Sequence, residues 1–162
     1  DYNTDLVKKI YNYGFNQGLN IDIISRDNST PGEYIQRLNA AFPDLYLEFH
    51  CDAYDGMPKV KGTSTFYTNN NKNSAILSHI IYEDLILLLE RKRKQCRGSK
   101  FLFMDERGYK NLINIRSPAC IVESFFIDNQ EEFAKIGVGK QDLIVKSICK
   151  SIKTFIDNYK EA

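Results

Sequence analysis

The chain has 162 residues, of which 43% are hydrophobic and 27% are charged, and its formal net charge is +1. This length and composition suit one folded domain with a sizeable core and argue against intrinsic disorder. The near-zero net charge gives no reason to expect nucleic acid or an anionic membrane as a partner. No apolar run approaches the roughly 20 residues of a membrane span, and the first residues lack the basic-then-apolar order of a signal peptide.

The first half of the chain predicts alternating helices and strands. Residues 4–17 place apolar side chains at helical spacing, and residues 21–26 form a short apolar run that is typical of a strand. Residues 31–42 begin with a proline, which is favoured in a first helical turn, and predict a second helix. Residues 45–50 then predict an apolar strand that ends in His50.

The second half continues the alternation. Residues 61–68, rich in threonine, predict a strand, and a long amphipathic helix is expected over residues 73–93. A short apolar piece at residues 101–104 precedes the strand that carries Glu123, and a last helix is expected over residues 140–159. The pattern predicts an α/β fold, a three-layer sandwich with a mostly parallel central sheet and helices on both faces.

The chain starts directly with a helix, whereas an open α/β sheet usually has a strand that leads into its first helix. We treat residues 1–162 as a single domain, and because of this start we expect that a strand is missing in front of it.

Four cysteines, Cys51, Cys96, Cys120 and Cys149, are scattered without a C-x-x-C pair. A domain of this size does not need disulfides, so we expect reduced and mostly buried thiols.

Glu123 is a carboxylate at the end of an apolar run that is otherwise built to be buried. Open α/β sheets place their chemistry at the ends of strands. Burial near an apolar floor that includes Ile121 and Phe125 would raise the pKa of Glu123 toward the range of a general base. The alternative is a structural carboxylate that an arginine or backbone donors satisfy.

His50 occupies the last position of its strand before a turn. Alternation along this strand sends Tyr46, Glu48 and His50 to one face, so Glu48 is placed either to orient His50 or to serve as a polar edge residue. An imidazole at this position can meet solvent or a metal. The alternative is a hydrogen-bonded, partly buried histidine.

The basic residues 91–94 follow the apolar part of the long helix. We interpret them as a solvated helix end, which the helix macrodipole favours. They lack the interleaved aromatic residues that would stack on bases, so they do not indicate a nucleic-acid site.

Three segments occur in an order that resembles the zinc-dependent N-acetylmuramoyl-L-alanine amidases of bacterial autolysins and phage endolysins. Residues 44–53 look like that family's apolar strand ending in a zinc-binding histidine. Residues 62–67 look like the strand that follows, which a glycine begins. Residues 106–110 and 121–129 look like the closing pair of motifs, of which the second carries the catalytic glutamate.

The resemblance implies a zinc cofactor and a peptidoglycan substrate. Metal-activated water would attack the amide between muramic acid and L-alanine, with Glu123 handling the proton and His50 on the zinc. Asp1 falls near the position of the family's second zinc ligand, and its alternative role is a helix cap. Arg107 and Arg116 are candidate substrate-binding residues. The site of action would be the cell wall or the extracellular space, with cytoplasmic accumulation before release as in phage lysins.

The chain departs from the family pattern because no histidine precedes His50. The family's first histidine motif is therefore absent from these residues, which agrees with the expected missing strand. A second hypothesis is a non-catalytic amidase-like module that binds muropeptide or a protein without a metal. A third is a cysteine-dependent hydrolase that uses Cys120.

Overall fold

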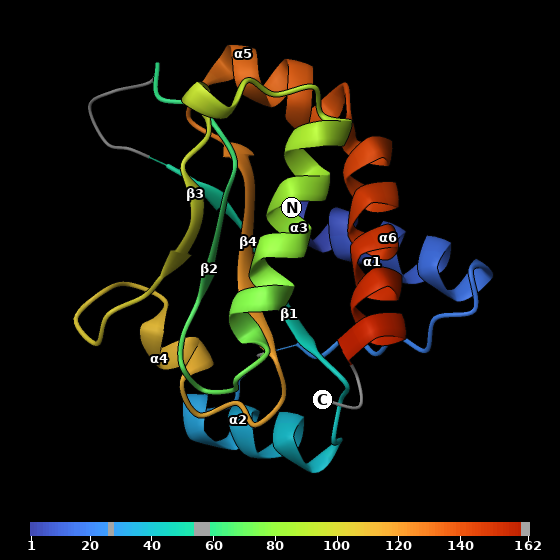
Figure 1. Cartoon of the computed structure of the whole chain (residues 1–162), viewed down its shortest axis with the longest axis vertical. Coiled ribbons are helices and arrows are strands. Elements are labelled where there is room, and N and C mark those ends of the chain that lie inside the picture. The colour runs from blue at the N-terminus through green and yellow to red at the C-terminus, as the bar shows by residue number, and fades with distance from the viewer. Residues whose placement is uncertain (26–27, 54–58, 160–162) are drawn as a thin grey trace.

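The computed structural model describes residues 1–25, 28–53 and 59–159. The main helices and the strands, in chain order, are α1 (Tyr2–Asn16), α2 (Pro31–Ala40), β1 (Tyr46–Asp52), β2 (Ser64–Tyr67), α3 (Ser74–Leu88), β3 (Gly98–Phe101), β4 (Ala119–Phe126) and α6 (Gln141–Tyr159) (Figure 1). Shorter helical turns are η1 (Arg93–Gln95), α4 (Tyr109–Leu112), α5 (Gln130–Glu132) and the π-helical η2 (Phe133–Val138). Among the described residues, no helix is long and apolar enough to cross a membrane.

The described strands form one mixed sheet in the order β1-β4-β2-β3. The pairs β1–β4 and β2–β3 are parallel, whereas the central pair β2–β4 is antiparallel. The predicted α/β class is confirmed. The parallel arrangement holds within each half of the sheet, and the two halves run in opposite directions.

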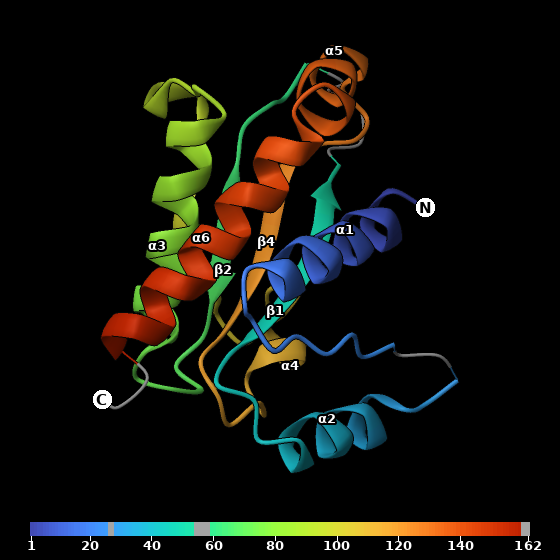
Figure 2. The ribbon, with the colours of Figure 1, turned by 90° about the vertical axis from the view of Figure 1, so that its right-hand side faces the viewer.

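Helices cover both faces of this sheet, as predicted (Figure 2). One core contains side chains of α1, α3 and α6 together with Cys120 and Val122 of β4. The other contains side chains of α2 and α4 together with Ala119 and Ile121. Because successive residues of a strand point to opposite faces, β4 contributes to both cores.

β4 is the strand that positions Glu123. It lies between β1 and β2, so both of its edges are paired and both of its faces are covered. Of its eight residues, Glu123 is the single position that is not fully buried. The apolar run in the sequence is therefore explained by burial on two sides, and Glu123 marks the point where the strand reaches solvent.

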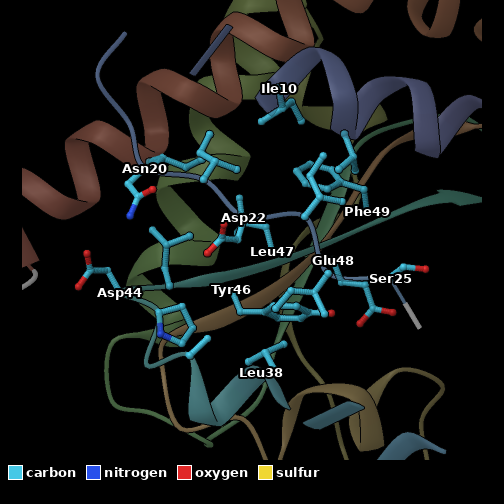
Figure 3. Close-up of a pocket in the computed structure, with 18 of the residues that line it drawn as sticks. Ile10, Asn20, Asp22, Ser25, Leu38, Asp44, Tyr46, Leu47, Glu48 and Phe49 are labelled. Carbon is cyan, nitrogen blue, oxygen red and sulfur yellow. The ribbon is translucent and has the colours of Figure 1, made fainter. Parts of the chain in front are cut away.

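The prediction of a strand over residues 21–26 is wrong for residues 21–25. Residues 21–25 lie outside the sheet, and residue 26 lies outside the described residues. Ile21 packs against the first core and Ile24 against the second. Residues 20–25 and β1 both line a cavity of about 690 Å³ (Figure 3). The segment therefore packs Ile21 and Ile24, each half-buried, beside the sheet, while Ile23 is exposed.

The long helix α3 ends at Leu88 and not at residue 93. Glu90 takes a left-handed φ of 55°, and the Arg91 N–H donates to the Ile86 carbonyl at 2.8 Å. This turn closes the helix in the manner of a Schellman motif. The prediction of a solvated basic helix end is therefore wrong for Arg91, whose side chain turns inward and is only 8% exposed.

Candidate active site

The register of the sheet brings three polar side chains of three strands together. His50 of β1 is the direct neighbour of Glu123 of β4, and Ser64 of β2 is its neighbour on the other side. His50 lies on the same side of β1 as Tyr46, and Glu123 lies on the same side of β4 as Ile121. Both side chains are therefore on the face of the sheet that α2 and α4 cover. The expected meeting of Glu123 and His50 at one rim of the sheet is confirmed.

Glu123 lies in an environment that favours its protonated form. Burial is the main cause, and the adjacent Asp52 adds charge repulsion and a hydrogen bond; together they raise the pKa of Glu123 from 4.5 to about 7. His50 and the Ser64 hydroxyl, whose Oγ lies 3.4 Å from Glu123 Oε2, act in the opposite direction. Near neutral pH this carboxyl group can therefore both accept and return a proton.

His50 is oriented by Glu48, which is one of the two roles considered for that residue. The Nε2 atom of His50 lies 2.8 Å from Glu48 Oε1, and Asn111 of α4 donates from Nδ2 to the same oxygen at 3.0 Å. The His50 side chain is 36% exposed. The ring is thus held from the protein side while it still reaches solvent.

An ion pair completes the rim. Arg97 Nη1 donates to Asp52 Oδ2 at 3.3 Å, and the guanidinium lies over the Phe126 ring, 5.3 Å from its centroid. The Ala53 backbone N–H donates to the other Asp52 oxygen. Arg97 and the Ala53 N–H therefore hold the Asp52 carboxyl group beside Glu123.

Sequence reasoning missed Asp52, Ser64, Arg97 and Asn111. The alternation that puts Glu48 and His50 on one face also indicates Asp52, two residues further on. The other three reach the site through strand order and through α4, which no local pattern reveals.

The remaining predicted site residues lie elsewhere or have other contacts. Asp1 caps α1, because its carboxylate accepts the Asn3 N–H at 3.1 Å and the Thr4 hydroxyl at 3.2 Å. Arg107 is exposed just before α4. Arg116 is exposed ahead of β4, at the end of that strand away from Glu123. The roles of all three as ligand or substrate contacts stay predictions.

The fit of a zinc ion can be judged from the donors at the rim. Structural and catalytic zinc sites use at least three protein ligands. Within residues 1–25, 28–53 and 59–159, no group of three or more histidine, cysteine, aspartate or glutamate side chains is arranged to hold a metal. His50 is the one imidazole near Glu123, since His79 lies on α3 and contacts Glu83. This part of the chain therefore does not form a complete zinc site.

The cysteines do not support a thiol nucleophile. Cys120 is fully buried in β4, and burial raises the pKa of its thiol far above the usual value. Burial and the nearby Glu123 raise the pKa of Cys51 to about 12. Both thiols stay protonated at neutral pH and lack the activation that a cysteine hydrolase needs.

Comparison with known proteins identifies the family. The family model for N-acetylmuramoyl-L-alanine amidase matches residues 1–154. No match was found among curated proteins.

Solved structures with the same fold include three amidases or lysins. The chain is similar to the catalytic domain of the CD27L endolysin targeting Clostridia Difficile, at 25% identity and a TM-score of 0.75, covering 94% of this chain and 82% of that one. It is similar to the catalytic domain of CwlV from Bacillus (Paenibacillus) polymyxa var. colistinus, at 14% identity, TM-score 0.79 and coverage of 96% and 83%. It is also similar to an N-acetylmuramoyl-L-alanine amidase from Clostridium difficile 630, at 20% identity and a TM-score of 0.75, covering 96% of this chain and 84% of that one. Because the family model matches nearly the whole length of this chain, the chain belongs to the N-acetylmuramoyl-L-alanine amidase family of peptidoglycan amidases.

Proposed function

We propose that this domain hydrolyses the amide bond between N-acetylmuramic acid and L-alanine in peptidoglycan, with Glu123 as the catalytic residue. Family membership supports the substrate class. The observation that carries the proposal is a carboxyl group with a pKa of about 7 at the one partly exposed position of a buried strand, beside His50. The domain would therefore act in the cell wall.

Glu123 performs two proton transfers in this proposal. As a carboxylate it takes a proton from the attacking water, whose oxygen adds to the carbonyl carbon of the lactyl group. As an acid it then gives that proton to the amide nitrogen while the carbon–nitrogen bond breaks, which leaves the free amino group of L-alanine and a lactyl carboxylic acid that releases the remaining water proton to solvent. A pKa near the working pH suits both steps, and Ser64 and Asp52 hold the carboxyl group in place.

We further propose that His50 is a zinc ligand. Its Nε2 is engaged by Glu48, as is typical of ligating histidines whose second nitrogen is held by a carboxylate. When bound, zinc would lower the pKa of water and polarise the carbonyl. The described residues do not complete its ligand set, so no step is assigned to the metal here. Asp1 would have to leave its cap to serve as a second ligand.

Arg107 and Arg116 are proposed to contact the substrate. Both are exposed cations, and peptide stems carry carboxylates that such side chains can bind.

The test is release of L-alanine amino termini from purified peptidoglycan at pH 7 with zinc supplied. Glu123→Gln keeps the size of the side chain but cannot transfer the proton, so the rate should fall at least about 100-fold. The matched control is Glu131→Gln, an exposed glutamate on α5 that pairs with Lys135. A folded Glu123→Gln variant with the full rate would contradict the mechanism.

Zinc content is measured in parallel. His50→Ala should lower the amount of zinc bound per chain, and an unchanged amount would exclude His50 as a ligand. If the wild-type chain neither binds zinc nor releases L-alanine termini, the non-catalytic module becomes the better description.

A further inference from the structure

A buried ion pair contacts the residues of β4 that follow Glu123. The side chains of Arg91 and Glu132 are 8% and 3% exposed, and Arg91 Nη1 donates to Glu132 Oε1. Two charges removed from water in this way are tolerated only when other hydrogen bonds also satisfy them. The Glu132 carboxylate does accept such bonds, from the Gly62 N–H at 3.1 Å and the Phe126 N–H at 2.9 Å.

The pair joins three segments that are distant in sequence. Arg91 Nη2 donates to the Ser124 carbonyl at 2.9 Å, and the Thr63 hydroxyl donates to the same oxygen at 2.8 Å. Arg91 follows α3, Gly62 and Thr63 precede β2, and Ser124 belongs to β4. Glu132 itself is held by Asn129, whose Oδ1 accepts its backbone N–H at 3.0 Å.

These contacts lie where the ladder between β2 and β4 stops. The last described pair between β2 and β4 is Ser64 with Glu123, and the register between β1 and β4 shifts after His50. Beyond Glu123, the Phe126 N–H and the Ser124 carbonyl are held by Glu132, Arg91 and Thr63 in place of β2.

We propose that Arg91 and Glu132 are positioning residues for Glu123. They hold the end of β4 against the loop that leads into β2, so that Glu123 stays beside Ser64. Ser124 is adjacent to Glu123 and Thr63 is adjacent to Ser64, so a shift at either contact moves the two side chains relative to each other. The kinetic part of this inference rests on the proposed function, whereas its structural part does not.

The geometry of Arg91 allows a sharp test. Its two Nη atoms contact different partners, Glu132 and the Ser124 carbonyl. Lysine has the same charge but a single nitrogen, so Arg91→Lys can keep the ion pair while losing the second contact. A role limited to neutralising Glu132 predicts wild-type behaviour for this variant. A positioning role predicts a loss of turnover in a folded protein.

The matched control is Arg93→Lys, two residues further on. Arg93 also pairs with a glutamate, Glu83, but its side chain is 69% exposed. Glu132→Asp is a second variant, because it keeps the charge but shortens the reach to Gly62 and Phe126.

Each variant is assayed for kcat, KM and thermal unfolding, and its backbone amide resonances are compared with the wild type by NMR. We expect Arg91→Lys and Glu132→Asp to lower kcat about 5- to 10-fold with KM within twofold, and to shift the amide resonances of Ser64 and Glu123. Arg93→Lys should change neither. Unchanged kcat in folded Arg91→Lys, or resonance shifts confined to Ser124 and Glu132, would overturn the inference. If the wild type has no activity, the proposed function fails, and the resonances of Ser64 and Glu123 alone decide about positioning.

Discussion

Replacing Glu123 by glutamine should make the protein more stable above neutral pH while it slows catalysis at least about 100-fold. In the unfolded chain a glutamate releases its proton near pH 4.5, whereas burial and Asp52 hold the pKa of folded Glu123 at about 7. Between these two values the folded state binds more protons than the unfolded state, so the free energy of unfolding falls as pH rises. Above pH 7 the loss is complete, and glutamine, which has no proton to release, avoids it.

The magnitude follows from the two pKa values. A gap from 4.5 to about 7, at about 1.4 kcal/mol per pH unit, corresponds to roughly 3 kcal/mol. For a domain of 162 residues this is about 6 to 12 °C in Tm.

The assay is thermal unfolding of wild type and Glu123→Gln at pH 4.5 and at pH 8, with EDTA present so that no divalent ion changes the charge around His50. The two proteins should unfold at similar temperatures at pH 4.5, and the variant should be the more stable at pH 8. Glu131→Gln, at an exposed position, should gain no stability between these pH values. A variant that is equally stable or less stable than wild type at pH 8 would refute the reasoning, because folded Glu123 would then ionise without cost.

Three further predictions concern the buried thiols, a close backbone contact and a helix cap. Iodoacetamide at pH 8 should leave Cys120 and Cys149 unmodified in the folded protein and label them in urea, as mass spectrometry would show, because burial raises both pKa values. Gly108→Ala should lower the free energy of unfolding by about 1 to 3 kcal/mol in urea titrations, since φ is 93° and an added Cβ would lie 2.7 Å from the Ile121 side chain; an unchanged midpoint would contradict this. Thr30→Ala removes the capping box of α2 and should cost about 1 kcal/mol in the same titration.

The meeting of His50 and Glu123 could be predicted from the sequence because it follows from local patterns. Each residue is a polar position within an apolar run, and alternation within the runs fixes the faces on which the side chains lie. Parallel pairing of the two strands then places His50 and Glu123 side by side, although both strands continue beyond them. The role of Glu48 follows from the same alternation, since it lies one pleat behind His50.

Other features depend on partners that the local pattern does not contain. The apolar pattern of residues 21–26 predicts burial correctly for Ile21 and Ile24, but it cannot say whether a neighbouring strand is close enough to pair. Arg97 follows a basic run of the kind that is usually solvent-exposed. The pairing of β3 with β2 nevertheless places its guanidinium beside Asp52. Arg91 is buried because its partner Glu132, 41 residues later, lies at the end of β4.

Glu123 and Glu132 show how one residue type takes two roles within nine positions of the same chain. Glu132 receives two backbone N–H groups and a guanidinium, so its negative charge is matched by donors, and proton transfer there would break the contacts that hold the strand end. Glu123 has Asp52 beside it and a single weak hydroxyl contact from Ser64, so its charge is poorly matched and its proton is easily exchanged near neutral pH. In the proposed arrangement Glu132 holds the strand, and Glu123 exchanges the proton. Improving the donors around Glu123 would stabilise the fold at neutral pH and, by lowering its pKa, weaken it as a proton carrier.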